Sequence, residues 1–279
     1  MNKILIIGAS SYIGARSYLD LSNWLKTTPI LGTYATNQIS EKFVKLDITN
    51  REEVKNIFSE FEPTIVIHFA NNANPRWCEE NKERARLVNQ DSTKYICDEC
   101  NNYGSKLIYI SSNIATNNCN FYAQTKIESE KIVSQLNKYS IVRPSFTLGY
   151  SPNTKNDRGL NRILKNISGE TEAIYDTSWK FQPTYLGQIS EIIFEIINRE
   201  LWNKTIPVIT NSMKSRFDIC NDILSHFDIT AKPVDLKDPT PHLVDNYQTL
   251  IDLNLPTYTY EEIVKKIVEE IKTPEKFVI

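Results

Sequence analysis

Short apolar runs alternate with longer amphipathic stretches through the first half of the chain. Six runs have the length and aliphatic, β-branched content of parallel strands buried on both faces: residues 4–7, 30–34, 43–46, 64–69, 106–110 and 139–142. Helical patterns fill the intervals, at residues 14–26, 49–61, 76–102 with a break near Asn81, and 120–136. This alternation predicts right-handed βαβ units and therefore an α/β fold with a doubly wound parallel sheet.

The pattern changes beyond Gly149. A polar, loop-like stretch at residues 151–158 precedes helical patterns at 160–167, 186–198, 216–227 and 260–271, and strand patterns at 173–175, 179–181 and 206–209. We therefore expect residues 1–150 to form a Rossmann domain and residues 151–279 to form mainly a smaller substrate-binding lobe. That lobe is expected to be discontinuous, because the segment at about 184–210 is predicted to return to the main sheet.

The first fourteen residues, MNKILIIGASSYIG, contain a strand, a glycine turn and the start of a helix. Gly8, Ser11 and Gly14 have the spacing of the glycines in a dinucleotide-binding turn, with serine in the middle position. Gly8 permits a tight turn, and the N–H groups of the turn and of the helix N-terminus favour the negative charge of a pyrophosphate. A glycine after a strand is also common in ordinary turns, so this stretch by itself leaves both interpretations open.

The second predicted strand ends in Gly-Thr-Tyr-Ala-Thr-Asn (32–37), without the acidic residue that often holds the adenosine ribose and without an arginine. A carboxylate there would repel a 2′-phosphate, so its absence permits NADP, which we expect to be slightly preferred over NAD. Asp47 follows the third strand. It either belongs to the start of the next helix, where Thr49 and Glu52 have capping-box spacing, or accepts a hydrogen bond from the adenine amino group.

The fourth and fifth predicted strands lead into polar residues, at the edge where open α/β sheets bind ligands. His68 lies within the apolar fourth strand and is expected to be a hydrogen-bonded core histidine. Asn89, in the following helical region, either braces neighbouring backbone or is solvated. The fifth strand ends in Ser111-Ser112-Asn113, whose hydroxyls are candidate ligands for a substrate oxygen.

Tyr122 and Lys126 are four residues apart on a predicted helix and therefore share a face. A phenol has a pKa of about 10, and a nearby ammonium lowers it by stabilising the phenolate. Such a phenol can donate a proton to a carbonyl oxygen that Ser112 or Ser111 holds. Tyrosine–lysine pairs at this spacing are common on surface helices, but of the fourteen tyrosines only Tyr122 has a lysine four positions on.

Composition limits the class of protein. With 41% hydrophobic and 24% charged residues the chain can build a full core, and a net charge of −2 without a Lys/Arg block argues against nucleic acid and anionic membranes as partners. The five cysteines lack the spacing of a disulfide framework. Cys97 and Cys100 form a CxxC inside a helical pattern, where packing is expected rather than a metal site. We therefore expect a globular cytoplasmic protein that binds no metal.

Together these residues resemble the extended short-chain dehydrogenase/reductases. The glycine turn, Asp47-Ile48, His68-Phe69-Ala70, Asn89, the serines, Tyr122-Ala-Gln-Thr-Lys126 and Arg143-Pro144 occur in the order of that family. Within it, the chain looks most like the dTDP-4-dehydrorhamnose reductase-like and NAD-dependent epimerase-like sugar-nucleotide proteins, on Trp77-Cys78-Glu79, Val88-Asn89 and Phe181-Gln182-Pro183-Thr184-Tyr185. The resemblance covers essentially the whole chain.

The resemblance implies a role for each matching residue. The residues implied to contact the cofactor are Gly8, Ser10, Ser11, Tyr12, Ile13, Gly14, Asp47, Ile48, Phe69, Ala70 and Asn71, of which Gly8 and residues 10–14 hold the pyrophosphate and residues 47–48 the adenine. Tyr34, at the end of the second predicted strand, is also expected to contact the cofactor. Tyr122 is implied to be the acid/base. Lys126 is implied to hold the nicotinamide ribose and to lower the pKa of Tyr122. Ser112 is implied to orient the substrate carbonyl, and Asn113 and Tyr122 are expected to contact the substrate with it.

Two features depart from the family pattern. Ser11 replaces the middle glycine, so its side chain either crowds the pyrophosphate or points away from it. The interval from Ser112 to Tyr122 is much shorter than usual, which removes part of a loop that lines the substrate pocket.

The expected activity is NAD(P)-dependent reduction of a keto group on a nucleotide-linked sugar, with Tyr122 as proton donor. The alternatives are an epimerase or dehydratase that recycles its cofactor, and a catalytically silent, cofactor-binding regulatory subunit. The sequence leaves the oligomeric state open, and a homodimer is compatible with it.

Overall fold

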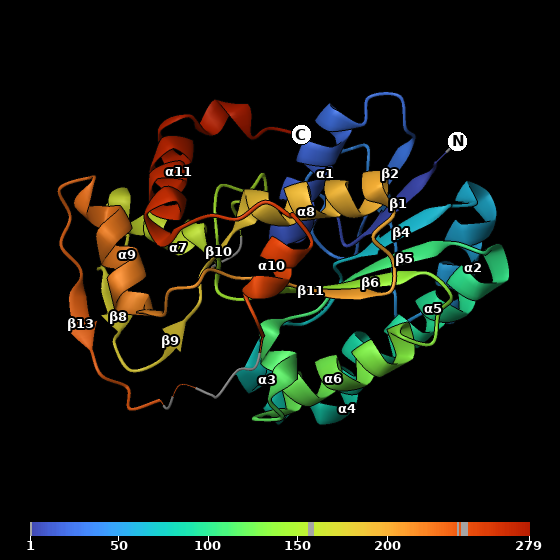
Figure 1. Ribbon diagram of the computed structural model, residues 1–279, viewed down its shortest axis with the longest axis horizontal. Helices are drawn as coiled ribbons and strands as arrows, with labels where there is room; N and C mark the ends of the chain where they lie inside the picture. Colours follow the sequence, from blue (N-terminus) through green and yellow to red (C-terminus); the bar gives the residue numbers. More distant parts are fainter. Residues whose placement is uncertain (1, 156–158, 239, 241–244) are drawn as a thin grey trace.

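A seven-stranded parallel sheet forms the centre of the computed structural model, which describes residues 2–155, 159–238, 240 and 245–279 (Figure 1). In spatial order its strands are β11 (Lys204–Val208), β6 (Tyr139–Pro144), β5 (Lys106–Ile110), β4 (Ile65–His68), β1 (Ile4–Ile7), β2 (Ile30–Tyr34) and β3 (Val44–Lys45). The chain runs from β1 outwards to β3 and then crosses back to β4, β5 and β6. This order confirms the predicted doubly wound sheet.

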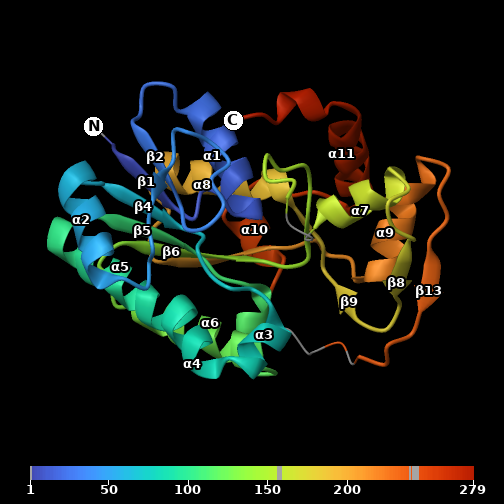
Figure 2. The ribbon, with the colours of Figure 1, turned by 180° about the vertical axis from the view of Figure 1, so that it is seen from behind.

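Helices cover both faces of the sheet (Figures 1 and 2). One face carries α2 (Arg51–Phe61), α5 (Ser92–Tyr103) and α6 (Phe121–Val133), and the other carries α1 (Tyr12–Trp24) and α8 (Leu186–Arg199). In β1, Leu5 and Ile7 pack toward the first set of helices, whereas Ile4 and Ile6 pack toward the second. All four are fully buried, which explains why this strand is apolar at every position.

The long helical region before β5 is broken at Asn81, as predicted. It consists of α3 (Pro75–Glu80), α4 (Lys82–Arg86), a π-helical turn at Leu87–Asp91, and α5. The π-helical turn places Asn89 on the inside of the molecule, where it is 1% exposed. Such turns are rare and frequently lie at functional sites.

The predicted capping box at the start of α2 is wrong. Asn50 caps this helix, with its side-chain oxygen accepting hydrogen bonds from the N–H groups of Glu52 and Glu53. The hydroxyl of Thr49 instead donates to Asp47 Oδ1 over 2.7 Å. Two adjacent residues could each cap the helix, and the turn formed by Asp47 decides in favour of Asn50.

A smaller lobe lies beside the sheet, at the left of Figure 1. Its elements are β7 (Thr147–Leu148), α7 (Leu160–Ile167), β8 (Ile174–Asp176), β9 (Lys180–Phe181), β10 (Thr184–Tyr185), β12 (Lys214–Ser215), α9 (Arg216–Ser225), β13 (Lys232–Val234) and α11 (Tyr260–Lys272). Between these elements the chain returns to the sheet, where β11 pairs with β6 and α10 (Gln248–Asp252) packs nearby. The domain boundaries at 150 and 151 stay a prediction, and residues 156–158 of the predicted loop lie outside the described residues.

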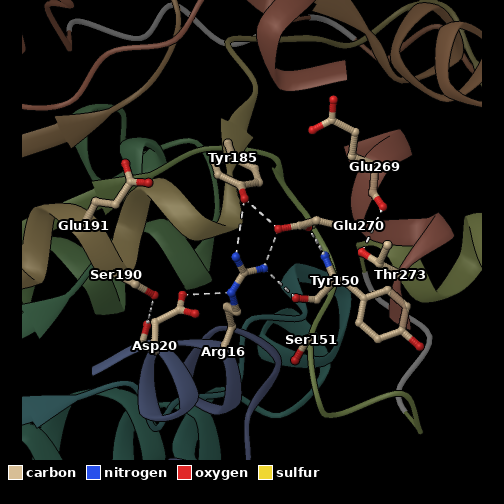
Figure 3. Close-up of polar contacts among 12 residues, drawn as sticks. Arg16, Asp20, Tyr150, Ser151, Tyr185, Ser190, Glu191, Glu269, Glu270 and Thr273 are labelled. Atoms are coloured by element: carbon tan, nitrogen blue, oxygen red, sulfur yellow. Dashed lines mark hydrogen bonds and ion pairs between the residues drawn. The ribbon is translucent and has the colours of Figure 1, made fainter. Parts of the chain in front are cut away.

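A buried ion-pair network joins α1 to the smaller lobe (Figure 3). Arg16 Nη1 lies 2.7 Å from Glu270 Oε1 on α11, and Arg16 Nε lies 2.8 Å from Asp20 Oδ2. The Tyr185 hydroxyl donates to Glu270 Oε1 over 2.6 Å. Arg16 also donates to the Tyr150 carbonyl, and Glu270 accepts the Tyr150 N–H. The ion pair therefore binds both backbone polar groups of Tyr150.

None of the helices in the described part of the chain is long and apolar enough to cross a membrane. Within the same residues, no group of three or more His, Cys, Asp or Glu side chains is placed to hold a metal ion. Cys97 and Cys100 are buried free thiols in the core, as expected from their helical pattern. Burial raises the pKa of the Cys97 thiol to about 12.

Candidate active site

The turn after β1 is a cradle that side chains would fill. Gly8 has a φ of +83°, and a Cβ atom there would lie 2.8 Å from the backbone nitrogen of Ala70. A Cβ atom on Gly14 would lie 2.2 Å from the Gly8 carbonyl oxygen. The first turn of α1 therefore packs directly against the end of β1, and its leading N–H groups have no acceptor within the helix. A phosphate group fits such a helix N-terminus.

Ser11 caps α1. Its Oγ accepts a hydrogen bond from the Gly14 N–H over 3.1 Å, and its own N–H donates to the Gly8 carbonyl over 3.0 Å. The hydroxyl is therefore directed at the helix, where it satisfies one of the unpaired N–H groups. This arrangement explains how a serine is accommodated where the family has its middle glycine.

The neighbouring residues of this loop contact the sheet and the smaller lobe. Thr33 Oγ1 on β2 accepts the Gly8 N–H over 3.0 Å, and the Thr33 carbonyl accepts the Ser10 N–H over 3.3 Å. The Tyr12 ring is buried, and its hydroxyl is directed at the smaller lobe. The side chains of Tyr12 and of the half-buried Ile13 thus pack against the core, and the contact of their backbone N–H groups with a pyrophosphate stays a prediction.

At the ends of β2 and β3, Tyr34 is half-buried against the core, and its carbonyl accepts the Leu46 N–H over 2.8 Å. Asp47 is exposed, and its Oδ1 accepts hydrogen bonds from the Thr49 N–H and hydroxyl. Ile48 is buried. Asp47 thus shapes the approach to α2, which is the first of its two interpretations, and its contact with adenine stays a prediction.

The end of β4 is braced from the helical region, as one of the two interpretations of Asn89 proposed. Asn89 Oδ1 accepts the Asn72 N–H over 2.7 Å, and Asn89 Nδ2 donates to the Asn72 carbonyl over 3.0 Å. The same amide donates to Thr125 Oγ1 on α6 over 3.2 Å. Asn89 therefore holds the loop after β4 in position relative to α6.

Phe69, Ala70 and Asn71 begin that loop. Phe69 is buried, Ala70 lies against Gly8, and Asn71 Nδ2 donates to the Phe69 carbonyl over 2.9 Å. Among the described residues, the buried Asn71 Oδ1 has no hydrogen-bond partner. A buried acceptor of this kind is costly unless a ligand or water satisfies it, so Asn71 Oδ1 is a candidate contact for a ligand.

His68 is a core histidine, as expected. Its Nε2 lies 3.2 Å from Thr93 Oγ1, and its ring lies against that of Tyr109. Burial, together with the charge of Lys126, lowers the pKa of His68 to about 3. The ring is therefore neutral at physiological pH and cannot act as an acid there.

The two serines after β5 differ in their surroundings. Ser111 is buried, and its hydroxyl donates to Glu130 Oε1 over 2.5 Å. Glu130 in turn accepts two hydrogen bonds from Arg143. Ser112 is half-buried, and its Oγ accepts the Ile114 N–H over 3.4 Å at the start of the 3₁₀ turn.

Asn113 follows Ser112 and is 5% exposed. Its Nδ2 has no hydrogen-bond partner in the part of the chain that the structure describes. A buried amide donor without a protein partner beside Ser112 is compatible with the predicted contact to a substrate.

Tyr122 lies in the first turn of α6, which Asn120 caps. Its buried ring packs in an apolar cluster that brings together α3, α6, the 3₁₀ turn and the smaller lobe. The cluster comprises Cys78, Ala85, Ile114, Tyr122 and Ala123, with Ala73, Trp77, Phe121 and Trp179 against it. The structure thus brings Tyr122 together with the residues around Ser112 and with Trp179 of the smaller lobe.

Lys126 is fully buried one turn further along α6. Its Nζ donates to the Ile110 carbonyl over 2.9 Å and to the Tyr109 hydroxyl over 3.0 Å, both at the end of β5. Burial lowers the pKa of Lys126 to about 7, although the charge of Glu130 acts in the opposite direction. The ammonium is therefore close to losing its proton at neutral pH, which is unusual for lysine.

Four residues of the smaller lobe and its approach, of which Trp179 packs against the cluster that contains Tyr122, were not predicted from the sequence as site residues. The rings of Trp179 and Phe181 are stacked with centroids 5.8 Å apart, and Phe146 lies 4.9 Å from Phe181. The Arg216 guanidinium lies 5.3 Å from the Phe146 centroid and 5.6 Å from that of Phe181. Two signals were available in the sequence. Trp179 and Phe181 are two residues apart in a strand pattern and therefore share a face. Arg216 lies at the N-terminus of a helix, where cations are unfavourable.

Asp176 holds the turn that presents Trp179. Its carboxylate accepts hydrogen bonds from the Ser178 N–H and hydroxyl and from the N–H groups of Trp179 and Leu236. Although burial opposes them, these donors hold the pKa of Asp176 well below its ordinary value. The position of Trp179 against the cluster that contains Tyr122 therefore depends on a carboxylate that stays ionised.

Comparisons with known proteins give distant relatives. The chain is 22% identical over 218 residues to methionine adenosyltransferase 2 subunit beta of Xenopus tropicalis, covering 73% of this chain but only 64%, less than two thirds, of that subunit's length. It is 23% identical over 230 residues to the dTDP-4-dehydrorhamnose reductase of Aggregatibacter actinomycetemcomitans, covering 74% of this chain and 71% of that enzyme.

Among solved structures, the dTDP-4-dehydrorhamnose reductase of Bacillus anthracis in complex with NADP superimposes with a TM-score of 0.80 at 21% identity, over 97% of this chain and 100% of the other. This likeness shows a shared fold. The model of the RmlD substrate binding domain family matches residues 1–271, which is nearly the whole chain. The protein therefore belongs to the RmlD substrate binding domain family.

Proposed function

We propose that the protein is an NAD(P)-dependent oxidoreductase that reduces a keto group on a nucleotide-linked sugar. The observation that carries the proposal is the arrangement on α6, where Tyr122 packs in a cluster with Ile114 of the turn after Ser112 and Lys126, one turn further on, is fully buried with its ammonium bonded to the end of β5. Membership of the family and the likeness to a dTDP-4-dehydrorhamnose reductase bound to NADP support this class of cofactor and substrate.

The residues after β1 fit a dinucleotide. Gly8 and Gly14 leave no room for a side chain, and the N–H groups of Tyr12 and Ile13 at the start of α1 would bind the pyrophosphate. Phe69, Ala70 and Asn71 would line the cleft along the cofactor. When bound there, the nicotinamide would supply a hydride to the substrate.

The remaining chemistry belongs to residues of this chain. As the hydride reaches the carbonyl carbon, Tyr122 would donate its hydroxyl proton to the carbonyl oxygen, and the two transfers together give an alcohol. The ammonium of Lys126 would stabilise the resulting phenolate. Ser112 is better suited than Ser111 to hold the carbonyl oxygen, because the Ser111 hydroxyl donates to Glu130.

The smaller lobe would recognise the nucleotide part of the substrate. Stacked Trp179 and Phe181 offer a flat apolar surface for a base, and Arg216 lies beside them. Arg216 Nε is buried and has no hydrogen-bond partner among the described residues. Arg162 on α7 adds a second cation, 5.5 Å from the Tyr175 ring centroid. One guanidinium beside the aromatic surface and a second in the same lobe suit a diphosphate that carries a base.

Purified protein, NADPH or NADH, and a panel of keto sugars linked to dTDP or UDP would test the proposal. We expect one cofactor to be oxidised for each alcohol formed with at least one sugar. Trp179→Ala and Arg216→Gln should raise the KM for that sugar more than they lower kcat. If no sugar is reduced although the cofactor binds, the proposed reductase activity is wrong.

A regulatory role is the second candidate, because one of the relatives is named as a subunit of methionine adenosyltransferase and the loop between Ser112 and Tyr122 is short. The same assay separates the alternatives. An epimerase or dehydratase would convert a nucleotide sugar without net consumption of cofactor. A regulatory subunit would bind the cofactor tightly and convert none of the sugars.

A further inference from the structure

The hydroxyl of Tyr12 links the glycine loop to the smaller lobe. It donates to the Gly149 carbonyl over 2.5 Å and accepts the Leu160 N–H over 3.0 Å. Leu160 is the first residue of α7, the helix that carries Arg162. One side chain at the start of α1 therefore bonds the first N–H group of α7, a group that has no acceptor within its own helix.

The Tyr12 ring is held in place by Gly159. A Cβ atom on Gly159 would lie 2.6 Å from the ring and from its hydroxyl oxygen, and Gly159 has a φ of +52°. The ring is 8% exposed, so it has little freedom to rotate independently of the backbone. The position of the hydroxyl is therefore tied to the position of the glycine loop.

The backbone of the same loop is bonded a second time. The Ser151 hydroxyl donates to the Tyr12 carbonyl over 2.7 Å, and Asn153 Nδ2 donates to the Ser10 carbonyl over 2.6 Å. Asn161 Nδ2 on α7 donates to the Asn153 carbonyl over 2.9 Å, which extends the connection into the helix. Ser151 and Asn153 thus bind the backbone of the glycine loop, in addition to the contacts that the Tyr12 hydroxyl makes.

We propose that Tyr12 is a positioning residue that couples cofactor binding to the substrate side: its backbone faces the pyrophosphate while its hydroxyl positions the start of α7 and hence Arg162. The proposal rests on the dinucleotide binding in the proposed function. The Tyr12 side chain touches neither the cofactor nor the substrate. It nevertheless couples occupancy of the cofactor site to the substrate side.

The physical route runs through a shared peptide group. The carbonyl of Tyr12 and the N–H of Ile13 belong to one peptide, so a phosphate on that N–H polarises the carbonyl that Ser151 binds. The phosphate also fixes the loop, and with it the Tyr12 hydroxyl. Because coupling free energies are reciprocal, a ligand that orders α7 would in turn tighten cofactor binding.

Tyr12→Phe tests the proposal, since it keeps the ring and removes both hydroxyl contacts. The matched control is Tyr18→Phe, another buried tyrosine of α1, whose ring packs on Phe43 with centroids 4.7 Å apart. Amide hydrogen exchange of the peptide that covers α7 is measured for each protein with and without saturating NADPH. The protection that NADPH adds is the exchange rate without NADPH divided by the exchange rate with NADPH.

In the unmodified protein and in Tyr18→Phe, NADPH should slow exchange at the start of α7 by about tenfold or more, the scale of two buried hydrogen bonds. In Tyr12→Phe this ratio should fall to about threefold or less, while NADPH still protects residues 8–14. A hydroxyl with only a structural role would raise exchange equally with and without NADPH. An unchanged ratio in Tyr12→Phe therefore overturns the proposal.

A second measurement uses dTDP as the probe of the substrate side. In the unmodified protein dTDP should lower the Kd for NADPH, and in Tyr12→Phe it should lower it less. The two proposals can fail separately. If NADPH binds and the exchange ratio depends on Tyr12 but no sugar is reduced, the coupling proposal stands and the reductase proposal fails. If neither NADPH nor NADH binds, both proposals are wrong.

Discussion

Lys126 Nζ lies 3.0 Å from the Tyr109 hydroxyl and 4.6 Å from the centroid of the Tyr109 ring. Tyr109 is itself 1% exposed, and burial raises the pKa of its phenol well above the ordinary value. The hydroxyl thus stays protonated and acts as a neutral acceptor for the ammonium. A lysine held by neutral oxygens in the core has a pKa that is easily shifted, and this has consequences for stability and for activity.

The first prediction concerns stability and pH. The pKa of Lys126 is lowered from 10.5 to about 7 in the folded state, so between these values the unfolded chain binds more protons than the folded one. The contribution of this group to the free energy of unfolding should therefore rise with pH from about 7 to about 10.5, by at most about 1.4 kcal/mol per pH unit.

Urea unfolding of the unmodified protein and of Lys126→Met across this range measures that contribution. The difference in the free energy of unfolding, unmodified minus variant, should increase with pH. A difference that is flat or decreases with pH would show that Lys126 keeps an ordinary pKa.

The second prediction concerns Tyr122. Tyr122→Phe removes one hydroxyl, so the fold and the affinity for NADPH should barely change, while kcat for the reduced sugar should fall by about a hundredfold or more. Lys126→Met should weaken NADPH binding as well as turnover. The double variant should be little worse than the single ones, because Lys126 acts partly through Tyr122.

Steady-state kinetics and a fluorescence titration with NADPH measure these effects. Tyr103→Phe, at an exposed residue near the end of α5, is the control and should behave like the unmodified protein. Near-normal turnover in Tyr122→Phe would remove this tyrosine from the mechanism.

The third prediction concerns cofactor choice. Residues 35–38 after β2 are exposed and contain neither acid nor base, so nothing there repels a 2′-phosphate. NADP(H) should bind at least as well as NAD(H). Introducing a carboxylate by Asn37→Asp should weaken NADP(H) binding relative to NAD(H), and Asn37→Ser serves as the neutral control. A clear preference of the unmodified protein for NAD(H) would instead point to steric exclusion of the phosphate by Tyr34.

The fourth prediction concerns the network in Figure 3. Arg16→Met leaves the carboxylates of Asp20 and Glu270 buried without their cation, so the free energy of unfolding should fall by about 3–5 kcal/mol. Adding Glu270→Gln should recover part of the loss, because it removes one of the unpaired charges. Arg76→Met at the exposed pair with Glu80 should leave the unfolding midpoint unchanged. Equal effects of Arg16→Met and Arg76→Met would show that burial adds nothing to the network.

The sequence by itself determined the alternation of strands and helices, and with it the sheet. Each signal was local: the apolar run at 4–7, the glycine at position 8, the break at Asn81 and the spacing of Tyr122 and Lys126. A buried parallel strand needs apolar residues on both faces, and a helix needs them every three or four residues, so both leave a periodic record. The family resemblance followed from the order of these local signals.

Only the tertiary structure decided which residues meet across the chain. Arg16 and Glu270 are 254 positions apart, Tyr12 and Leu160 are 148 apart, and no periodicity links either pair. The structure also decided which of two neighbouring residues caps α2, namely Asn50 rather than Thr49. Hydrogen bonds and ion pairs between distant elements depend on how the elements pack, and packing is set by the whole core. For that reason the sequence could name Lys126 but not the burial that lowers its pKa.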